Sequence, residues 1–270
     1  MTWLAAALLG VVQGLTEFLP VSSSAHLVLA RAFFGWNVDE GAFGLAFDVA
    51  LHAGTLAAIL LYFRRDIALM LAAVPEALSA NRGPAKVARL IVIGTIPVVI
   101  IGLVFASWLE EHMRRPEVIA VTLTVGGVWL LAAERFGVRT HEHDALTAGG
   151  ALLVGTAQAS ALIPGMSRSG STIAMAMLLG MTRESAARFS FLLGIPAIGA
   201  AAAKEGLHVL RAGMTVHDVQ LFALGMLTSA VVGFLTIKFF LRYVTGRSLS
   251  VFAYYRLALA AVTVVWLMAR

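Results

Sequence analysis

The side chains that could do chemistry gather in two short segments, each inside a stretch that is otherwise apolar. The first is EFLPVSSSAHL (17–27) and the second is PGMSRSGST (164–172). Both combine serine hydroxyls with an ionisable group, which is Glu17 in the first and Arg168 in the second. Hydroxyls, a guanidinium and the free N–H groups of a helix start are the groups that bind phosphate, so the two segments predict an anion site.

In the first segment, the spacing places two polar groups on one side of a helix. Gln13 and Glu17 are four residues apart, so a helix that ends near Pro20 presents both on the same face. The serines that follow can cap the next helix, whose first N–H groups favour an anion. Those serines are Ser22, Ser23 and Ser24.

Hydroxyls also crowd the expected helix start of the second segment, just after Pro164 and Gly165. Arg168 lies among them and can hold a phosphate bidentately. We therefore expect this segment to bind the phosphate of a substrate. The hydroxyls belong to Ser167, Ser169 and Thr172.

Glu17 and Arg168 are the two residues that most strongly indicate a function. Each costs about 2.5–3.5 kcal/mol at the centre of a bilayer, and ionisable residues at that depth are functional by default. The alternative is a structural ion pair between Glu17 and Arg168 that locks the two segments together. Such a pair would explain the two charges but not the hydroxyls around them.

Three other polar residues allow two interpretations each. His26 is three residues from Ser23 and shares its helical face, but a lone histidine in an apolar segment is often a packing residue. Asp48 and His52 are also four residues apart. They can border the same cavity, or they can satisfy backbone groups that a helix break sets free.

Composition identifies the class of protein. The chain has 270 residues, of which 60% are hydrophobic and 13% charged, and its mean hydropathy is +0.88. Soluble domains are about 45–50% apolar and about 25% charged. Because the apolar runs lack the alternation of a barrel strand, we expect an all-α polytopic membrane protein. The net charge of +5 reflects basic residues at segment ends, which set topology and meet anionic head groups, so no nucleic-acid partner is expected.

The apolar runs predict six transmembrane helices. Arg256, near the start of the last one, is expected to extend to the head groups. The piece 67–78 is too short to cross and is expected to lie at the interface. The predicted spans are 43–63, 90–109, 118–133, 189–203, 219–237 and 250–269.

Two further apolar stretches do not fit as ordinary spans. As straight helices, 1–30 and 145–182 would run roughly 45 and 57 Å. The hydrocarbon core of a bilayer is only about 30 Å thick. Each stretch contains a proline near its middle, Pro20 in one and Pro164 in the other. We therefore predict two re-entrant helical hairpins, each broken at its proline.

The two hairpins resemble each other. GVVQGLTEFLPVSSSAHL (10–27) and GTAQASALIPGMSRSGST (155–172) both run Gly-x-x-Gln, then Pro, then a serine-rich turn. The whole chain, 1–270, is read as a single membrane domain made of two repeats, about 1–135 and 145–270. The basic loop between residues 64 and 89 is expected to be cytoplasmic. On that basis the hairpins enter from opposite sides, which is an inverted-topology repeat.

QGLTEFLPVSSSAHL and PGMSRSGST resemble the two signature motifs of the undecaprenyl-pyrophosphate phosphatase family, which is linked to bacitracin resistance. The motifs are [Glu/Gln]-x-x-x-Glu followed by Pro-x-Ser-Ser, and Pro-Gly-x-Ser-Arg-Ser-x-x-Thr. The resemblance implies a multi-pass enzyme of the bacterial inner (cytoplasmic) membrane with an outward-opening site. Its substrate would be undecaprenyl pyrophosphate, whose terminal phosphate it removes to recycle a cell-wall lipid carrier. It also implies a divalent cation, Mg²⁺ or Ca²⁺, and a homodimer.

The same resemblance implies roles for individual residues. Glu17 matches the essential carboxylate, Ser23 the serine proposed as nucleophile and His26 the nearby histidine. Arg168 matches the phosphate-binding arginine. Gln13 stands where some members have Glu, so a metal held by Gln13 and Glu17 would have one carboxylate fewer. The supporting hydroxyls are Ser167, Ser169 and Thr172, with Ser22 and Ser24 as further candidates.

Two mechanisms stay open from the sequence. In the first, Ser23 attacks the terminal phosphorus and His26 takes its proton, while Glu17 holds the metal or orients His26. In the second, His26 is the nucleophile and forms a phosphohistidine, with Glu17 as base.

A function of another class also fits the architecture. Inverted repeats with broken helices are typical of transporters, so the chain could move an anion or flip a polyprenyl phosphate, alone or in addition to hydrolysis. Asp48 and His52 could then relay protons. Transport needs binding groups but no nucleophile, so the serine, histidine and carboxylate opposite the Ser-Arg-Ser segment favour the enzyme.

Overall fold

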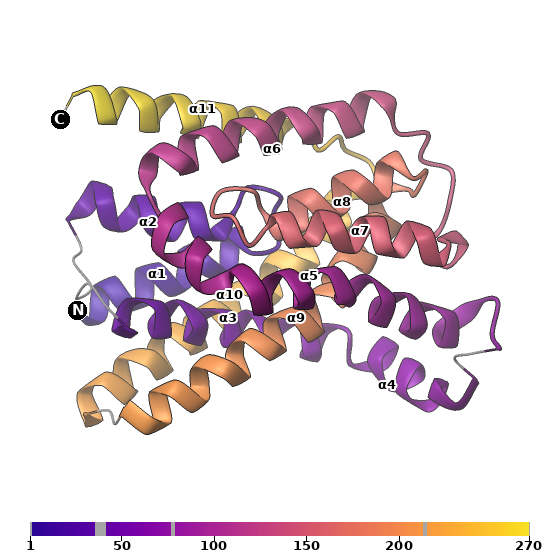
Figure 1. Ribbon diagram of the computed structural model, residues 1–270, viewed down its shortest axis with the longest axis horizontal. Coiled ribbons are helices and arrows are strands. Elements are labelled where there is room, and N and C mark those ends of the chain that lie inside the picture. The colour runs from indigo at the N-terminus through magenta and orange to yellow at the C-terminus, as the bar shows by residue number, and fades with distance from the viewer. Residues whose placement is uncertain (1, 36–41, 77–78, 213–214, 270) are drawn as a thin grey trace.

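The computed structural model describes residues 2–35, 42–76, 79–212 and 215–269. Within them the regular secondary structure is helical, apart from one isolated bridge between His141 and Met181. Figure 1 shows the helices packed into one bundle, with α6 and α11 along the top of the view. Two short 3₁₀ helices span Val74–Glu76 and His143–Ala145. The α-helices are α1 (Trp3–Thr16), α2 (Ser23–Phe34), α3 (Ala42–Tyr62), α4 (Arg64–Ala72), α5 (Gly83–Met113), α6 (Pro116–Phe136), α7 (Ala148–Ser160), α8 (Arg168–Leu178), α9 (Arg183–Ala212), α10 (Val216–Val244) and α11 (Ser250–Met268).

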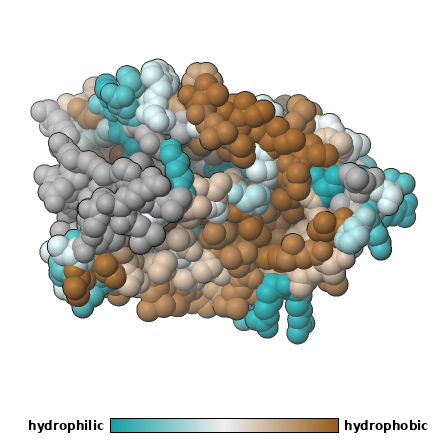
Figure 2. All heavy atoms as spheres, turned by 60° about the horizontal axis from the view of Figure 1, so that its bottom comes forward, coloured by the Kyte–Doolittle hydropathy of each residue, from teal (hydrophilic) through white to brown (hydrophobic). Residues whose placement is uncertain are grey.

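The predicted class, an all-α polytopic membrane protein, is confirmed. In the described part of the chain, five helices are long and apolar enough to cross a bilayer, namely α5, α6, α9, α10 and α11. The helix α3 becomes a sixth when it is counted with α4, which is bent 72° away from it. Large apolar side chains such as Leu103 and Val265 are exposed, and Figure 2 shows a broad hydrophobic surface on one face. Lipid tails rather than water suit such a surface.

Several spans are longer than expected, and α5, α9 and α10 have 31, 30 and 29 residues. The stretch 189–203 is predicted as a short span with Gly194 and Pro196 inside it. The structure instead has a continuous helix of 30 residues, α9, that runs through both. Proline is tolerated inside a membrane helix where neighbouring helices cover the freed backbone group.

Both predicted hairpins are present. The first breaks between α1 and α2, at residues 17–22, and the second between α7 and α8, at residues 161–167. Each break contains a proline, which cannot donate a backbone hydrogen bond and so ends the first helix. The next helix starts at the serine-rich turn in both hairpins.

The packing of the helices is reciprocal between the two halves of the chain. Helix α1 lies along α10, as α7 lies along α5, and α3 packs on α10 as α9 packs on α5. The equivalent helices also pair with each other, α3 with α9 and α6 with α11 (Figure 1). At the crossing of α7 and α5 the backbones touch, because a Cβ added to Gly155 would lie 2.1 Å from the carbonyl oxygen of Gly94. This reciprocity favours the predicted pair of repeats, whose boundaries stay a prediction.

Arg256 does not extend to the head groups as expected. Its side chain is fully buried and donates to backbone carbonyl groups at both hairpin breaks. The acceptors include Pro20 in the first break at 3.4 Å and Gly165 and Met166 in the second at 2.9 and 3.1 Å. Two carbonyls of α6, those of Thr122 and Leu123, complete the set. The sequence interpretation was wrong because it considered only the position of Arg256 along its own helix.

Candidate active site

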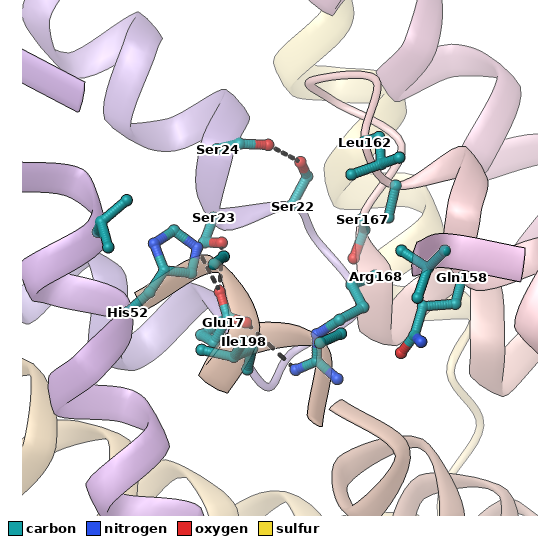
Figure 3. A pocket seen from close by; sticks show the side chains of 15 residues that line it. Glu17, Ser22, Ser23, Ser24, His52, Gln158, Leu162, Ser167, Arg168 and Ile198 are labelled. Atoms are coloured by element: carbon teal, nitrogen blue, oxygen red, sulfur yellow. Dashed lines mark hydrogen bonds and ion pairs between the residues drawn. The ribbon is translucent and has the colours of Figure 1, made fainter. Parts of the chain in front are cut away.

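The two hairpin breaks meet at a pocket of about 230 Å³. Figure 3 shows side chains of the first hairpin on one side of it and those of the second hairpin on the other. Helices α3, α5 and α9 supply the remaining walls. The polar lining residues are Glu17, Ser22, Ser23, Ser24, His52, Gln158, Ser167 and Arg168, and the apolar ones are Val49, Val98, Ala161, Leu162, Ala197, Ile198 and Ala201.

Glu17 is the centre of the polar network in this pocket. Its Oε2 accepts hydrogen bonds from Ser23 Oγ at 2.6 Å and from Gln13 Nε2 at 3.0 Å. Its Oε1 accepts from Nη2 of Arg168 at 3.2 Å. Nε2 of His52 lies 3.5 Å from Oε2. Glu17 therefore joins a hydroxyl of its own hairpin to the guanidinium of the other.

Arg168 is held in place by its surroundings. Nη1 donates to the carbonyl oxygen of Ser190 at 3.1 Å, Nη2 donates to Glu17, and Nε has no partner among the described residues. The guanidinium lies directly against the backbone of α9, because a Cβ added to Gly194 would be 2.0 Å from Nη1. The ion pair that the sequence allowed as a structural alternative is thus present, but inside a pocket lined by hydroxyls.

Ser22 and Ser167 hold the same strained position in the two hairpins. Each is the N-cap of the second helix and has a positive φ, 74° for Ser22 and 68° for Ser167. Their hydroxyls accept the backbone N–H groups of Ala25 and Gly170 at 3.4 and 3.1 Å. Such a conformation costs about 1–3 kcal/mol in a non-glycine residue and persists only where the surroundings hold it. The caps keep the following N–H groups directed toward the break.

Two other predicted phosphate ligands connect structural elements. Ser169 Oγ donates to the carbonyl oxygen of Leu19 at 3.0 Å and so ties the second hairpin to the first. Thr172 shares a 2.6 Å hydrogen bond with the hydroxyl of Ser190 on α9. Neither residue lines the pocket. Both therefore join α8, the helix that begins with Arg168, to neighbouring segments.

Ser24 lines the pocket and also connects the hairpins. Its hydroxyl accepts the backbone N–H of Gly165 at 3.4 Å and interacts with that of Ser22 at 3.2 Å. Ser24 therefore belongs to both the cavity wall and the contact between the two breaks.

His26 is directed to other partners. Its Nδ1 donates to the carbonyl oxygen of Ser22 at 2.7 Å, and its Nε2 pairs with the hydroxyl of Tyr255 at 2.8 Å. The two rings are stacked with their centroids 5.6 Å apart. His26 is not among the residues that line the pocket, so the structure brings Ser23 to Glu17 and not to His26.

The side chains of Asp48 and His52 have different surroundings, although the two residues lie one helical turn apart. His52 lines the pocket. Asp48 is buried and forms ion pairs with Arg31 of α2 and Arg114 at the end of α5. The carboxylate therefore joins three helices, and only the histidine borders the cavity.

Several residues of the site were missed by sequence reasoning. Gln158 could have been found, because it occupies the place of Gln13 in the second repeat, and Gly194 lies in a stretch that resembles the first repeat. The contacts of Ser190, Tyr255 and Arg256 had no sequence signal, since each depends on a partner more than fifteen residues away.

The polar groups give partial support for a metal. Among the described residues there is no group of three or more histidine, cysteine, aspartate or glutamate side chains that could hold an ion. Gln13 Oε1, however, is a buried acceptor without a partner in the described structure, and it adjoins Glu17. One carboxylate and one amide oxygen fit a cation that takes its other ligands from water and substrate phosphates, as Mg²⁺ commonly does.

Comparisons with known proteins cover almost the whole chain. Residues 6–262 match the family described as Bacitracin resistance protein BacA. A protein of Rubrobacter xylanophilus is 45% identical over 262 residues, 96% of each chain. Relatives from Alcanivorax borkumensis and Chromohalobacter salexigens are 44% and 45% identical, over 99% and 98% of this chain and 100% and 99% of their own. All three carry the name undecaprenyl-diphosphatase.

Proposed function

The chain belongs to the BacA family of bacitracin resistance proteins, and from that premise we propose that it is an integral membrane phosphatase. It hydrolyses undecaprenyl pyrophosphate to undecaprenyl phosphate and inorganic phosphate, and so recycles the lipid carrier of cell-wall synthesis. The observation that carries this function is the meeting of Ser23, Glu17 and Arg168 at one pocket. A hydroxyl, a base and a cation are the three groups that phosphoryl transfer needs.

Binding comes first. Arg168 and the N-terminus of α8 attract the diphosphate, and the N-terminus of α2 faces it from the other hairpin. Arg168 already has its guanidinium fixed against Ser190 and Gly194, so little reorganisation is needed when charge spreads over the transferring phosphoryl group.

In the chemical step, Ser23 Oγ attacks the terminal phosphorus. The Oγ–P bond forms, the bond from phosphorus to the bridging oxygen breaks, and Glu17 takes the hydroxyl proton. The 2.6 Å hydrogen bond from Ser23 to Glu17 supports this assignment of the base. Glu17 then passes the proton to the departing undecaprenyl phosphate.

A water molecule completes the cycle. It attacks the phosphoserine, its proton goes to Glu17, and the P–Oγ bond breaks as the proton returns to Ser23. His52, whose Nε2 lies 3.5 Å from Glu17, is placed to hold a positive charge beside the carboxylate during these transfers. The sum of both steps consumes one substrate and one water and releases the lipid monophosphate and inorganic phosphate.

His26 has a positioning role in this scheme. It supports the carbonyl of Ser22, the residue directly before the nucleophile, and is itself held by Tyr255. The alternative roles of His26, as base or as nucleophile, stay predictions. They require the ring to leave both of its present partners.

A divalent cation, Mg²⁺ or Ca²⁺, is part of the proposal. Glu17 and the free Oε1 of Gln13 would hold it. When bound, it would neutralise phosphate charge beside Arg168.

The apolar wall of the pocket suits the first isoprene units of the substrate, since Val98, Leu162 and Ile198 line it next to the polar groups. We propose that the pocket opens outward from the bacterial inner membrane. In support, Val49 and Ala201 lie on α3 and α9 away from the ends that adjoin the basic loop 64–89, which is predicted to be cytoplasmic. The homodimer implied by the resemblance stays a prediction.

Phosphate release tests this function directly. Detergent-purified protein is assayed with farnesyl or undecaprenyl pyrophosphate, with and without EDTA, beside Ser23→Ala. We expect release that needs a divalent cation and falls to background in the variant. A folded, metal-replete wild-type protein that releases no phosphate would contradict the proposal and favour lipid transport, which translocation in vesicles would then measure.

A further inference from the structure

Gln158 is a buried polar side chain that the chemistry described so far does not use. It lies near the end of α7, is only 1% exposed and belongs to the lining of the pocket. Neither its Nε2 nor its Oε1 has a hydrogen-bond partner among the described residues. In Figure 3 it lies with Arg168 on the side of the pocket that the second hairpin forms. A buried amide without partners is disfavoured unless something else binds it.

The comparison with Gln13 shows why this amide is unpartnered. Each glutamine precedes the capping serine of its hairpin by nine residues, Gln13 before Ser22 and Gln158 before Ser167. Gln13 donates to Glu17, four residues later. The residue four positions after Gln158 is Leu162, whose side chain cannot accept a hydrogen bond.

The free groups next to Gln158 are also donors. Arg168 donates one hydrogen bond from each terminal nitrogen to a protein acceptor, and its Nε–H has no partner in the described structure. Arg168 and Gln158 therefore line the same pocket, and each has a buried N–H group without a partner in the described structure. Two such donors, one charged and one neutral, match two oxygens of a phosphate.

We propose that Gln158 is a substrate-binding residue whose Nε2 donates to a non-bridging oxygen of the diphosphate beside Arg168. This inference rests on the proposed function and extends its binding site. A neutral amide at this position orients the phosphate and adds no charge to the Glu17–Arg168 pair. The crossing of Gly155 with Gly94, one turn earlier on α7, holds the helix that carries it.

A purely structural role makes a different prediction about stability and binding together. If Gln158 contributes nothing but fold, its replacement should lower stability or leave every property unchanged. If it is kept for the substrate, an apolar residue of similar shape removes a buried unpaired amide, so stability should be kept or should rise. Gln158→Leu separates these cases.

The experiment compares wild type, Gln158→Leu, Gln158→Glu and the control Gln220→Leu, which makes the same replacement at an exposed site on α10. Phosphate release from farnesyl pyrophosphate gives kcat and KM, and thermal unfolding with and without that ligand gives binding. For Gln158→Leu we expect an equal or higher Tm in the absence of ligand, a smaller ligand-induced shift, and kcat/KM lower by about ten- to a hundredfold, mainly through KM. In Gln158→Glu, kcat/KM should fall further because a carboxylate repels the phosphate.

Unchanged kcat/KM and ligand-induced stabilisation in Gln158→Leu would overturn the inference, as would a fall in Tm with normal binding. The proposed function fails separately, if wild type releases no phosphate. Binding still decides the inference in that case: it stands if farnesyl pyrophosphate stabilises wild type but not Gln158→Leu, and falls if both or neither are stabilised.

Discussion

The two hairpin breaks have a similar backbone conformation but differ in their side chains. In both, a glutamine precedes the capping serine by nine residues, and that serine has a positive φ. The first residue of the second helix is Ser23 in one hairpin and Arg168 in the other. The same local structure therefore presents a nucleophile from one side and a cation from the other.

The two hairpins also carry different residue types at the position four residues after each glutamine. Glu17 in the first hairpin faces the guanidinium of the second, whereas Leu162 in the second forms part of the apolar wall. Two identical hairpins would bring like charges together near the middle of the membrane, which is costly. The comparison teaches that two breaks of similar backbone conformation form the pocket and that differences in a few side chains determine its chemistry.

The largest effect is expected from removing the cation of the second hairpin. Arg168→Ala should lower kcat/KM by about a thousandfold or more, because transition-state charge then lacks its main partner. Arg168→Lys should recover only part of the loss, since lysine cannot make the forked contacts with Ser190 and Glu17. Phosphate-release kinetics measure both. A fully active Arg168→Lys would show that charge alone matters and not the geometry of the break.

Arg256 tests whether the two breaks depend on one common support. Arg256→Met leaves carbonyl groups of both hairpins without their donor and should lower the free energy of unfolding by about 3 kcal/mol or more. Thermal unfolding in detergent measures the loss. Proteolysis should increase at both breaks together. Increased cleavage at only one of them would mean that the hairpins are held independently.

Gly194 tests how closely the second hairpin is held against α9. In Gly194→Ala the new methyl group overlaps the guanidinium of Arg168, so kcat/KM should fall by about ten- to a hundredfold. Gly199→Ala is the matched control on the same helix, because its nearest atom, on Leu56, would be 3.9 Å away. Equal activity of the two variants would contradict the fixed position of Arg168.

The smallest effect concerns the strained caps, where the hairpins are most alike. Ser167→Ala loses the cap but keeps the strain and should cost about 1 kcal/mol of stability. Ser167→Gly loses the same hydroxyl but tolerates the positive φ, so it should cost less. The same order is expected for the Ser22 variants by thermal unfolding. An order that holds at only one of the two serines would show that the breaks are not equivalent.

Much of the fold could be predicted because it depends on local properties of the chain. Apolar runs of bilayer length predicted the spanning helices, and a proline inside an overlong run predicted each hairpin. A proline alone does not predict a break: α9 runs through Pro196, because a proline is tolerated inside a membrane helix where neighbouring helices protect the freed carbonyl. That protection depends on packing and has no local signal.

The site shows the same division. Glu17 and Arg168 could be predicted because ionisable residues in the membrane are rare and conspicuous. The direction of the His26 side chain could not be predicted. Its spacing from Ser23 places both on one helical face, but it does not reveal a competing partner on another helix, which is Tyr255. Asp48 likewise found its arginine partners on other helices.

The sequence by itself determined the class of protein, the two broken segments and the kinds of groups that each carries, because these follow from composition, length and spacing along one helix. Tertiary structure alone decided which groups meet. It brought Ser23 into hydrogen-bond contact with Glu17, Glu17 into contact with Arg168, and Arg256 into contact with backbone carbonyls of both breaks. The physical reason is that these contacts join segments more than a hundred residues apart or turn on the path of the chain within a break, and both depend on how the whole bundle packs.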